Sequence, residues 1–120
     1  MEDDPALCKM IRYMLRHRCQ TTIAHTYAEA LVALEREAFA AGLVDINLGA
    51  DRTGLDVLRT VRAQSGWAEM RLLAITAYAL PGDASRFLEL GFDGYLAKPF
   101  TRQALLDHVE RLLSRPRPTP

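Results

Sequence analysis

The sequence predicts an α/β protein of one domain, in which helices pack on a parallel β-sheet. Short apolar segments alternate with amphipathic segments along the chain, and this alternation is typical of β-α units joined by crossovers. The segment Arg71–Thr76 contains an unbroken apolar run, which indicates a strand buried on both faces, as in a parallel sheet. A chain of 120 residues is long enough to bury a hydrophobic core without disulfides or structural metals.

The first half of the chain is expected to form three helices and two strands. Each helical segment carries apolar residues at the i, i+3, i+4, i+7 spacing of one helix face. Pro5 suits the first turn of the first helix, and Thr26 suits the N-cap of the second. A β-branched run after the first helix and an apolar run before Asp45 predict strands. The expected elements are helix 5–17, strand 21–25, helix 27–39, strand 40–45 and helix 54–63.

The second half of the chain continues this alternation. Gly91 is expected to end a helix, and Thr101 is expected to cap the last one. Alternate prolines in the final residues exclude a helix or a central strand there. The expected elements are strand 71–76, helix 83–90, strand 94–97 and helix 101–114, so that a domain of residues 1–114 precedes a Pro-rich linker or tail at 115–120.

Composition and charge narrow the classes of function. The formal net charge is zero, which argues against direct nucleic-acid binding and against a polybasic membrane anchor. Apolar runs fall well short of the roughly 20 residues that span a bilayer. Acidic residues follow Met1, which is the wrong charge for a signal peptide. Cys8 and Cys19 lack metal or CxxC spacing and are expected to be reduced thiols, so we expect a cytoplasmic protein without membrane contact.

Reactive side chains follow the expected strands at the point where each strand ends. Asp45 and Thr76 end two strands, Lys98 follows a third, and Glu2 and Asp3 follow Met1 at the start of the sequence. Ligands of open α/β sheets gather at the carboxyl ends of the strands, so these groups are expected to converge. Clustered carboxylates repel one another, and Mg²⁺ would relieve that repulsion. A lysine and a hydroxyl beside the ion indicate a phosphoryl site, in which a carboxylate can act as the nucleophile.

Four motifs in this order closely resemble the receiver domain of two-component response regulators, the CheY-like family. They are Glu-Asp-Asp at 2–4, Val-Asp-Ile-Asn-Leu-Gly at 44–49, Ala-Ile-Thr-Ala-Tyr-Ala at 74–79 and Gly-Phe-Asp-Gly-Tyr-Leu-Ala-Lys-Pro-Phe at 91–100. Each motif alone is weak, but the four together cover residues 2–113 at the family's spacing. The resemblance implies a flavodoxin-like, doubly wound parallel sheet in the strand order 2-1-3-4-5, with helices on both faces.

The resemblance also implies a metal site and a phosphoacceptor. Asp45 would accept the phosphoryl group and bind Mg²⁺. Asp3 would bind the ion directly, Glu2 would help through a water molecule, and the carbonyl of Asn47 would complete the protein ligands. The Lys98–Pro99 peptide bond would be cis, which proline allows at small cost.

The remaining roles that the resemblance implies concern the bound phosphoryl group. The hydroxyl of Thr76 and the N–H of Ala77 would donate to it, and Lys98 would pair with one of its oxygens. Tyr95 would change rotamer when Thr76 moves inward. Asn47 and Tyr78 lie where receivers tune the lifetime of the phosphoryl group, and a bulky Tyr78 is expected to hinder the attack of water.

The implied function is a phosphorylation-dependent switch, and two alternative functions remain open. A histidine kinase or histidine phosphotransfer protein would donate the phosphoryl group, and the face formed by residues 83–114 would contact a dimer mate or target. A degenerate receiver that only docks proteins is one alternative. A small Mg²⁺-dependent phosphohydrolase is another, although Asn47 stands where such an enzyme would want a second acid. The chain could stand alone or belong to a longer sensor kinase.

One expected element has no counterpart in the sequence. The first strand of the 2-1-3-4-5 order is central and needs roughly five apolar residues, but only Met1 precedes the acidic motif. Burying three or four such side chains contributes about 5–10 kcal/mol, which is comparable with the stability of a whole domain. We therefore expect that the natural polypeptide starts upstream of Met1, or that another segment or chain fills the place of this strand.

Overall fold

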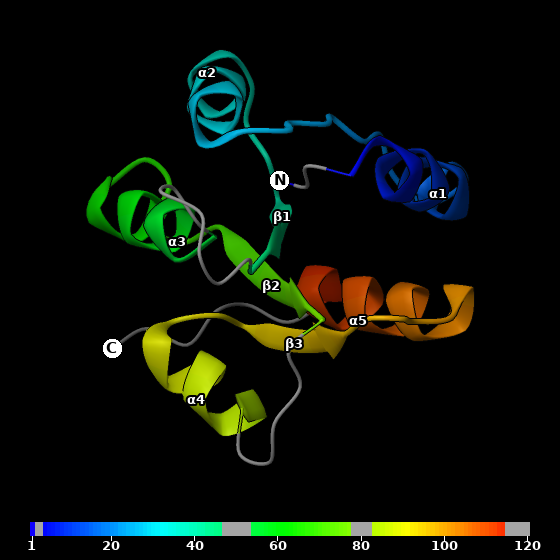
Figure 1. Ribbon diagram of the computed structural model, residues 1–120. Helices are drawn as coiled ribbons and strands as arrows, with labels where there is room; N and C mark the ends of the chain where they lie inside the picture. Colours follow the sequence, from blue (N-terminus) through cyan, green and yellow to red (C-terminus); the bar gives the residue numbers. More distant parts are fainter. Residues whose placement is uncertain (2–3, 47–53, 78–82, 115–120) are drawn as a thin grey trace.

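The computed structural model describes residues 1, 4–46, 54–77 and 83–114. In this part of the chain, helices and strands alternate as the sequence predicts, apart from one strand (Figure 1). The elements are α1 (Pro5–Leu15), α2 (Tyr27–Arg36), β1 (Ala41–Asp45), α3 (Gly54–Ala63), β2 (Arg71–Thr76), α4 (Asp83–Leu90), β3 (Gly94–Ala97) and α5 (Arg102–Ser114). None of the helices in these ranges is long and apolar enough to cross a membrane.

The three strands form a parallel sheet in the order β1-β2-β3. Helices cover both faces, so the doubly wound α/β architecture is confirmed (Figure 1). The three strands correspond to the last three of the predicted order 2-1-3-4-5. Hydrophobic side chains of α2, α3 and α4 cover one face, and those of α1 and α5 cover the other.

The sheet separates two hydrophobic clusters because successive strand residues point to opposite faces. Val44 and Leu72 belong to the cluster beneath α2 and α3, whereas Leu73 and Ile75 belong to the cluster beneath α5. Every residue of β2 from Leu72 to Thr76 is buried, as expected for the central strand of a sheet covered on both sides.

The prediction of a strand over residues 21–25 is wrong. This segment is irregular in the structure, although β-branched residues suit a strand. In the predicted order this strand would pair only with the first strand, and residues 21–25 have no such neighbour. A strand without a ladder leaves its backbone groups unpaired, so residue propensity alone does not produce one.

Met1 occupies one position of the missing central strand. Its amino group donates to the carbonyl of Leu43, and its carbonyl accepts from the Asp45 N–H at 2.9 Å. These two bonds flank Val44, which is the pattern of a parallel pair between Met1 and Val44. Met1 therefore lies on the side of β1 opposite to β2, in line with the place that the first strand would take.

Side-chain caps define where several helices begin. Asp4 accepts from the Ala6 N–H at 3.0 Å at the start of α1, and Thr26 accepts from the Glu29 N–H at 3.1 Å at the start of α2. The predicted Thr101 cap of α5 is confirmed. Helices α1 and α2 end at Leu15 and Arg36, earlier than predicted.

Gly91 ends α4 as predicted, since its φ of 120° lies in the region that favours glycine.

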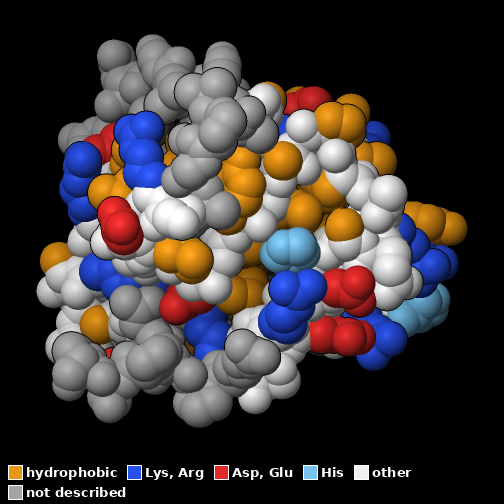
Figure 2. Space-filling view, turned by 90° about the horizontal axis from the view of Figure 1, so that it is seen from below, with side chains coloured by type: hydrophobic (Ala, Val, Ile, Leu, Met, Phe, Trp, Pro, Cys, Tyr) orange, Lys and Arg blue, Asp and Glu red, His pale blue; other side chains and the backbone are white. Residues whose placement is uncertain are grey.

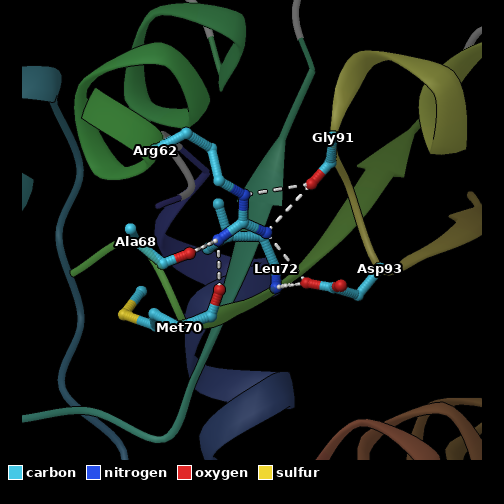
Figure 3. A network of polar contacts seen from close by, with 6 residues as sticks. All are labelled: Arg62, Ala68, Met70, Leu72, Gly91 and Asp93. Atoms are coloured by element: carbon cyan, nitrogen blue, oxygen red, sulfur yellow. Dashed lines mark hydrogen bonds and ion pairs between the residues drawn. The ribbon is translucent and has the colours of Figure 1, made fainter. Parts of the chain in front are cut away.

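A network around Arg62 fixes the amino-terminal end of the sheet (Figure 3). The guanidinium of Arg62 donates to the carbonyls of Ala68, Met70 and Gly91. It also pairs with Asp93 at 2.9 Å, and the same carboxylate oxygen accepts from the Leu72 N–H at 2.8 Å. One side chain thus joins α3 to the connections that enter β2 and β3.

Candidate functional site

The carboxyl ends of the three strands lie next to one another. The register pairs Asp45 with Ile75 across β1 and β2, and Thr76 with Ala97 across β2 and β3. Lys98 follows Ala97 directly. The sheet therefore brings Asp45, Thr76 and Lys98 to one edge, as predicted from the strand ends.

Lys98 and Asp45 form an ion pair at this edge. Nζ of Lys98 lies 2.9 Å from Oδ1 of Asp45, and the two side chains are only 22% and 12% exposed. Low exposure weakens screening by water, so the attraction is stronger here than at an open surface. The pair places a cationic donor beside the carboxylate that the sequence singles out as the reactive group.

Two close contacts fix the backbone of Asp45. Its N–H donates to the Met1 carbonyl at 2.9 Å. The first residue of α3, Gly54, packs against it so tightly that an added Cβ would lie 2.5 Å from the Asp45 carbonyl oxygen. Glycine is required at position 54 because no larger residue fits without a shift of this backbone. This role of Gly54 could not be predicted from the sequence, because a glycine at the start of a helix is ordinary.

Thr76 and Lys98 are linked through the backbone. Thr76 is completely buried, and its carbonyl accepts from the Lys98 N–H at 2.8 Å. The Lys98–Pro99 peptide bond is cis, which confirms the expectation from the resemblance. Ala77 follows Thr76 and is exposed at the same edge.

Tyr95 lies in an aromatic cluster beside this edge. Its ring stacks on Phe87 of α4, with centroids 5.3 Å apart and planes at 18°. Phe87 also meets Phe92 edge to face at 6.0 Å. A change of the Tyr95 rotamer would therefore alter its packing against α4. The stacking role of Phe87 could not be predicted from the sequence, because its spacing on α4 indicates only a core residue.

The predicted metal site combines Asp45 with three residues outside the described part of the chain. The predicted ligands Glu2, Asp3 and Asn47, and the lifetime residue Tyr78, lie outside the described residues. Among the residues that the structure describes, no group of three or more His, Cys, Asp or Glu side chains could hold a metal ion. Asp45 offers carboxylate oxygens of the kind that Mg²⁺ prefers, so the described part of the predicted set is chemically suitable.

The face that carries α4, β3 and α5 mixes apolar and charged side chains (Figure 2). Leu88 and Leu90 of α4 and Leu113 of α5 are exposed hydrophobic residues on these elements. Charged side chains lie between such groups, which is the ordinary composition of a folded protein's surface.

Comparison with known proteins identifies the family. The model of the response regulator receiver domain matches residues 1–110, so the chain belongs to this family of two-component signalling proteins. Receiver domains are signalling switches, not enzymes in the usual sense.

Several curated relatives share this domain. The chemotaxis protein CheY of Pseudomonas aeruginosa is 30% identical over 117 residues, which cover 96% of this chain and 94% of CheY. The alginate biosynthesis regulator AlgB of Pseudomonas putida is 33% identical over 100 residues, which cover 82% of this chain but 22% of AlgB. The sensor protein GacS of Pseudomonas syringae is 28% identical, and the match covers 91% of this chain and 12% of GacS. The chain thus spans only a small part of several relatives.

Solved receiver domains share the fold. The receiver domain of the sensor histidine kinase PA1611 of Pseudomonas aeruginosa has a TM-score of 0.82 at 33% identity, covering 96% of this chain and 94% of that chain. That structure is described as having a magnesium ion in its active-site cleft. The chemotaxis protein CheY4 of Vibrio cholerae has a TM-score of 0.84 at 26% identity, covering 93% of both chains.

Proposed function

We propose that this domain is a phosphorylation switch that accepts a phosphoryl group on Asp45. The observation that carries the proposal is the 2.9 Å ion pair between Lys98 Nζ and Asp45 Oδ1. It places an ammonium donor beside the carboxylate at the edge where the strands end. The proposal further assigns the domain to residues 1–114 and a linker or tail to residues 115–120.

The transfer step needs a nucleophile, charge neutralisation and a leaving group. A carboxylate oxygen of Asp45 attacks the phosphorus of the donor and forms an acyl phosphate. The bond between phosphorus and the donor breaks, and its electron pair leaves with the donor, which takes a proton from water. Lys98 pairs with a phosphoryl oxygen, while the hydroxyl of Thr76 and the N–H of Ala77 donate to the others. The chain contributes mainly position and charge, which phosphoryl transfer chiefly requires.

Mg²⁺ is the proposed cofactor. Asp45, Asp3, Glu2 and the carbonyl of Asn47 would hold it, and the bound ion would neutralise charge between the carboxylates and the phosphoryl group. The Asp45 N–H donates to the carbonyl of Met1, and Met1 precedes the acidic motif in the sequence. The magnesium described for the PA1611 receiver domain supports the same chemistry here.

The proposed response involves Thr76 and Tyr95. The phosphoryl group would draw the Thr76 hydroxyl toward Asp45, and Tyr95 would leave its stack on Phe87. This change would alter the face formed by residues 83–114, which would then contact a second copy or a target. The donor would be a histidine kinase or a histidine phosphotransfer protein in the cytoplasm. The similarity to the receiver domain of the sensor histidine kinase PA1611 supports a histidine kinase as the donor.

The test is a phosphorylation assay read by intact mass. The protein is incubated with Mg²⁺ and a small phosphodonor such as acetyl phosphate, and the gain of one phosphoryl group is followed over time. Asp45→Asn removes the nucleophile and should abolish the gain. Asp107→Asn is the matched control, because Asp107 lies on α5 and bonds to Gln103 there. This control should be phosphorylated like the parent.

The same assay separates the alternatives. A stable adduct that requires Asp45 and Mg²⁺ supports the switch. Rapid turnover of the donor without an adduct would instead indicate a phosphohydrolase. No adduct and no turnover from the folded protein would indicate a domain that only docks proteins. Either of the last two outcomes would overturn the proposal.

A further inference from the structure

Positive charge is concentrated on and just after α1, in a chain whose formal net charge is zero. Between Asp4 and Glu29 the sequence contains no aspartate or glutamate. The basic residues of that stretch, leaving histidines aside, are Lys9, Arg12, Arg16 and Arg18. The zero net charge of the whole chain therefore averages over an uneven distribution, and an argument from net charge alone does not describe this helix.

The cations form a stripe along α1, beside a second stripe of apolar groups. Lys9, Arg12 and Arg16 are exposed and follow the i, i+3, i+7 spacing of one helix side. Met10 and Tyr13 lie next to them and are 43% and 62% exposed. The opposite side of α1 is buried against the cluster that α5 covers (Figure 1). We call the five exposed residues the basic face.

Neutral groups hold the two arginines of the basic face. The guanidinium of Arg12 donates to the carbonyl of Thr21 at 3.2 Å. The guanidinium of Arg16 donates to the carbonyl of Tyr13 at 2.6 Å, and its Cζ lies 3.7 Å from the centroid of the Tyr13 ring. A carbonyl or a ring fixes the position of a guanidinium without cancelling its charge. Both cations are therefore held at the surface with their full charge.

The charge of the basic face is not compensated within the part of the chain that the structure describes. No ion pair there involves Lys9, Arg12 or Arg16, whereas Arg18 pairs with Glu110 of α5 at 3.0 Å. Lys9 and Arg16 are about 10 Å apart along the helix axis, close to the Debye length of about 8 Å, so the fields of these cations add. The helix dipole favours cations in the last turn of α1, but it does not account for Lys9 in the first half.

We propose that the basic face docks on an anionic lipid surface. Helix α1 lies flat on the bilayer, and its three cations sit among the phosphate groups. Met10 and Tyr13 reach the boundary between headgroups and acyl chains. A tyrosine suits this boundary because its ring is apolar and its hydroxyl is polar. The contact does not depend on the phosphorylation of Asp45.

The shape of the basic face favours a lipid surface over a protein or a nucleic acid. The outer side of a single helix is convex, whereas a specific protein interface usually centres on an anchor that fills a pocket. A fluid bilayer adapts to a convex face and requires no pocket. Arginines that recognise a single phosphate use several N–H donors at once. Arg12 and Arg16 already donate to backbone carbonyls, so they supply diffuse charge, which suits a layer of anionic headgroups.

The test measures the partition of the 120-residue chain onto lipid vesicles by co-sedimentation. Phosphatidylcholine vesicles that contain about 40% phosphatidylglycerol are compared with vesicles of phosphatidylcholine alone, in about 50 mM salt. We expect binding to the anionic vesicles only, with at least about a tenfold loss when the salt is raised to about 0.5 M. Failure of the folded protein to bind the anionic vesicles would overturn the proposal.

Substitutions of the cations test the assignment to this face. The variant Lys9→Gln/Arg12→Gln/Arg16→Gln should bind at least about tenfold more weakly, because each cation near an anionic surface contributes about fivefold in affinity. The variant Arg12→Lys/Arg16→Lys keeps the charge and should bind within about threefold of the parent, since headgroups respond to charge and not to the fork of a guanidinium. Loss of binding in this second variant would point to a site for a single phosphate and would contradict a lipid surface.

A matched control removes the same charge from the other side of the sheet. Arg36, Arg59 and Arg86 are exposed on α2, α3 and α4, which cover the face opposite to α1. Their joint replacement by glutamine should weaken vesicle binding by less than about threefold, because these positions do not face the bilayer. Equal losses in the two triple variants would show that net charge, and not the basic face, causes the binding, and the proposal would then be wrong.

The apolar groups distinguish a lipid surface from other polyanions. The variant Met10→Ser/Tyr13→Ser should bind the anionic vesicles at least about threefold more weakly at unchanged salt, because it loses the groups that reach the acyl boundary. The same measurements are made with poly-glutamate and with a DNA duplex as probes. Binding to either probe as tight as to the vesicles, with no effect of the serine substitutions, would identify a general polyanion contact and would overturn the proposal.

Discussion

Nζ of Lys98 lies 2.9 Å from Oδ1 of Asp45, although 53 residues separate them in the chain. The pair joins the end of β1 to the connection between β3 and α5. Strands β1 and β3 lie on the two sides of β2. Because Lys98 N–H also donates to the carbonyl of Thr76, one residue contacts both neighbouring strand ends. The position of Lys98 therefore depends on the register of all three strands.

Replacing Lys98 with alanine tests its proposed role in the transfer step. We expect the rate of Asp45 phosphorylation by acetyl phosphate to fall at least about tenfold, because a cationic donor to the phosphoryl group is lost. The measurement is the initial rate of mass gain at fixed Mg²⁺. Lys9→Ala is the control, since Lys9 is exposed on α1. Equal rates for parent and Lys98→Ala would contradict the role assigned to this lysine.

Replacing Thr76 with valine separates transfer from response. Valine keeps the shape of the buried side chain but removes the hydroxyl. We expect Asp45 still to be phosphorylated, while the change at Tyr95 is lost because no hydroxyl is drawn toward the phosphoryl group. The measurement is the ring chemical shift of Tyr95 before and after phosphorylation. Thr76→Ser should restore the change, and a full response in Thr76→Val would rule out the proposed coupling.

Replacing Gly54 with alanine tests the close contact beneath the site. The added Cβ would lie 2.5 Å from the Asp45 carbonyl oxygen and 2.6 Å from a methyl group of Val44. We expect the free energy of unfolding in urea to fall by about 1–3 kcal/mol, as for other overpacked positions. Gly66→Ala is the matched control, because a Cβ there meets nothing within 4 Å. Similar losses in both variants would show that the contact is not the cause.

The sequence predicts most of the fold because local signals and global packing agree. The apolar run of β2 and the caps of α2 and α5 each indicate the element that forms. The strand expected over residues 21–25 does not form, because a strand requires a hydrogen-bonding partner and this segment has none among the described strands. Helix α2 ends at Arg36 although the apolar spacing continues to Phe39. Phe39 instead packs against the core from the connection to β1.

The sequence predicts which residues of the candidate site lie together, but it does not predict the contacts that position them. Asp45, Thr76 and Lys98 could be placed together because strand ends of a parallel sheet share one edge. The contacts that hold this edge could not be predicted. Gly54 allows the close approach of α3 to Asp45, which is evident only from the packing of α3 against β1. Met1 pairs with β1 through two hydrogen bonds, which are evident only from the structure. Such contacts depend on three-dimensional distances that no spacing along the chain encodes.

The structural role of Arg62 could not be predicted from the sequence. It stands in the last turn of α3, where an arginine usually serves as an exposed charge at the end of a helix. In the structure its side chain is only 17% exposed and reaches three carbonyls and the carboxylate of Asp93. The network lies at the end of the sheet opposite to Asp45, so we expect it to support the fold without taking part in phosphorylation.

Replacing Arg62 with methionine should therefore lower stability while sparing the chemistry. The substitution removes the guanidinium and leaves the Asp93 carboxylate in a mostly buried site with the Leu72 N–H but without its cation. We expect the free energy of unfolding in urea to fall by about 3 kcal/mol. Arg62→Lys should recover less than half of this loss, since an ammonium group cannot reproduce the planar fork of donors.

Arg59→Met is the control for Arg62→Met, because Arg59 lies on the same helix with a side chain that is 74% exposed. This substitution should change the free energy of unfolding by less than about 0.5 kcal/mol. Under conditions where each variant is folded, the rate of Asp45 phosphorylation should match that of the parent. A stable Arg62→Met protein that is phosphorylated slowly would instead connect this network to the opposite edge of the sheet. That result would contradict a purely structural role, because it would require the two ends of the strands to be coupled.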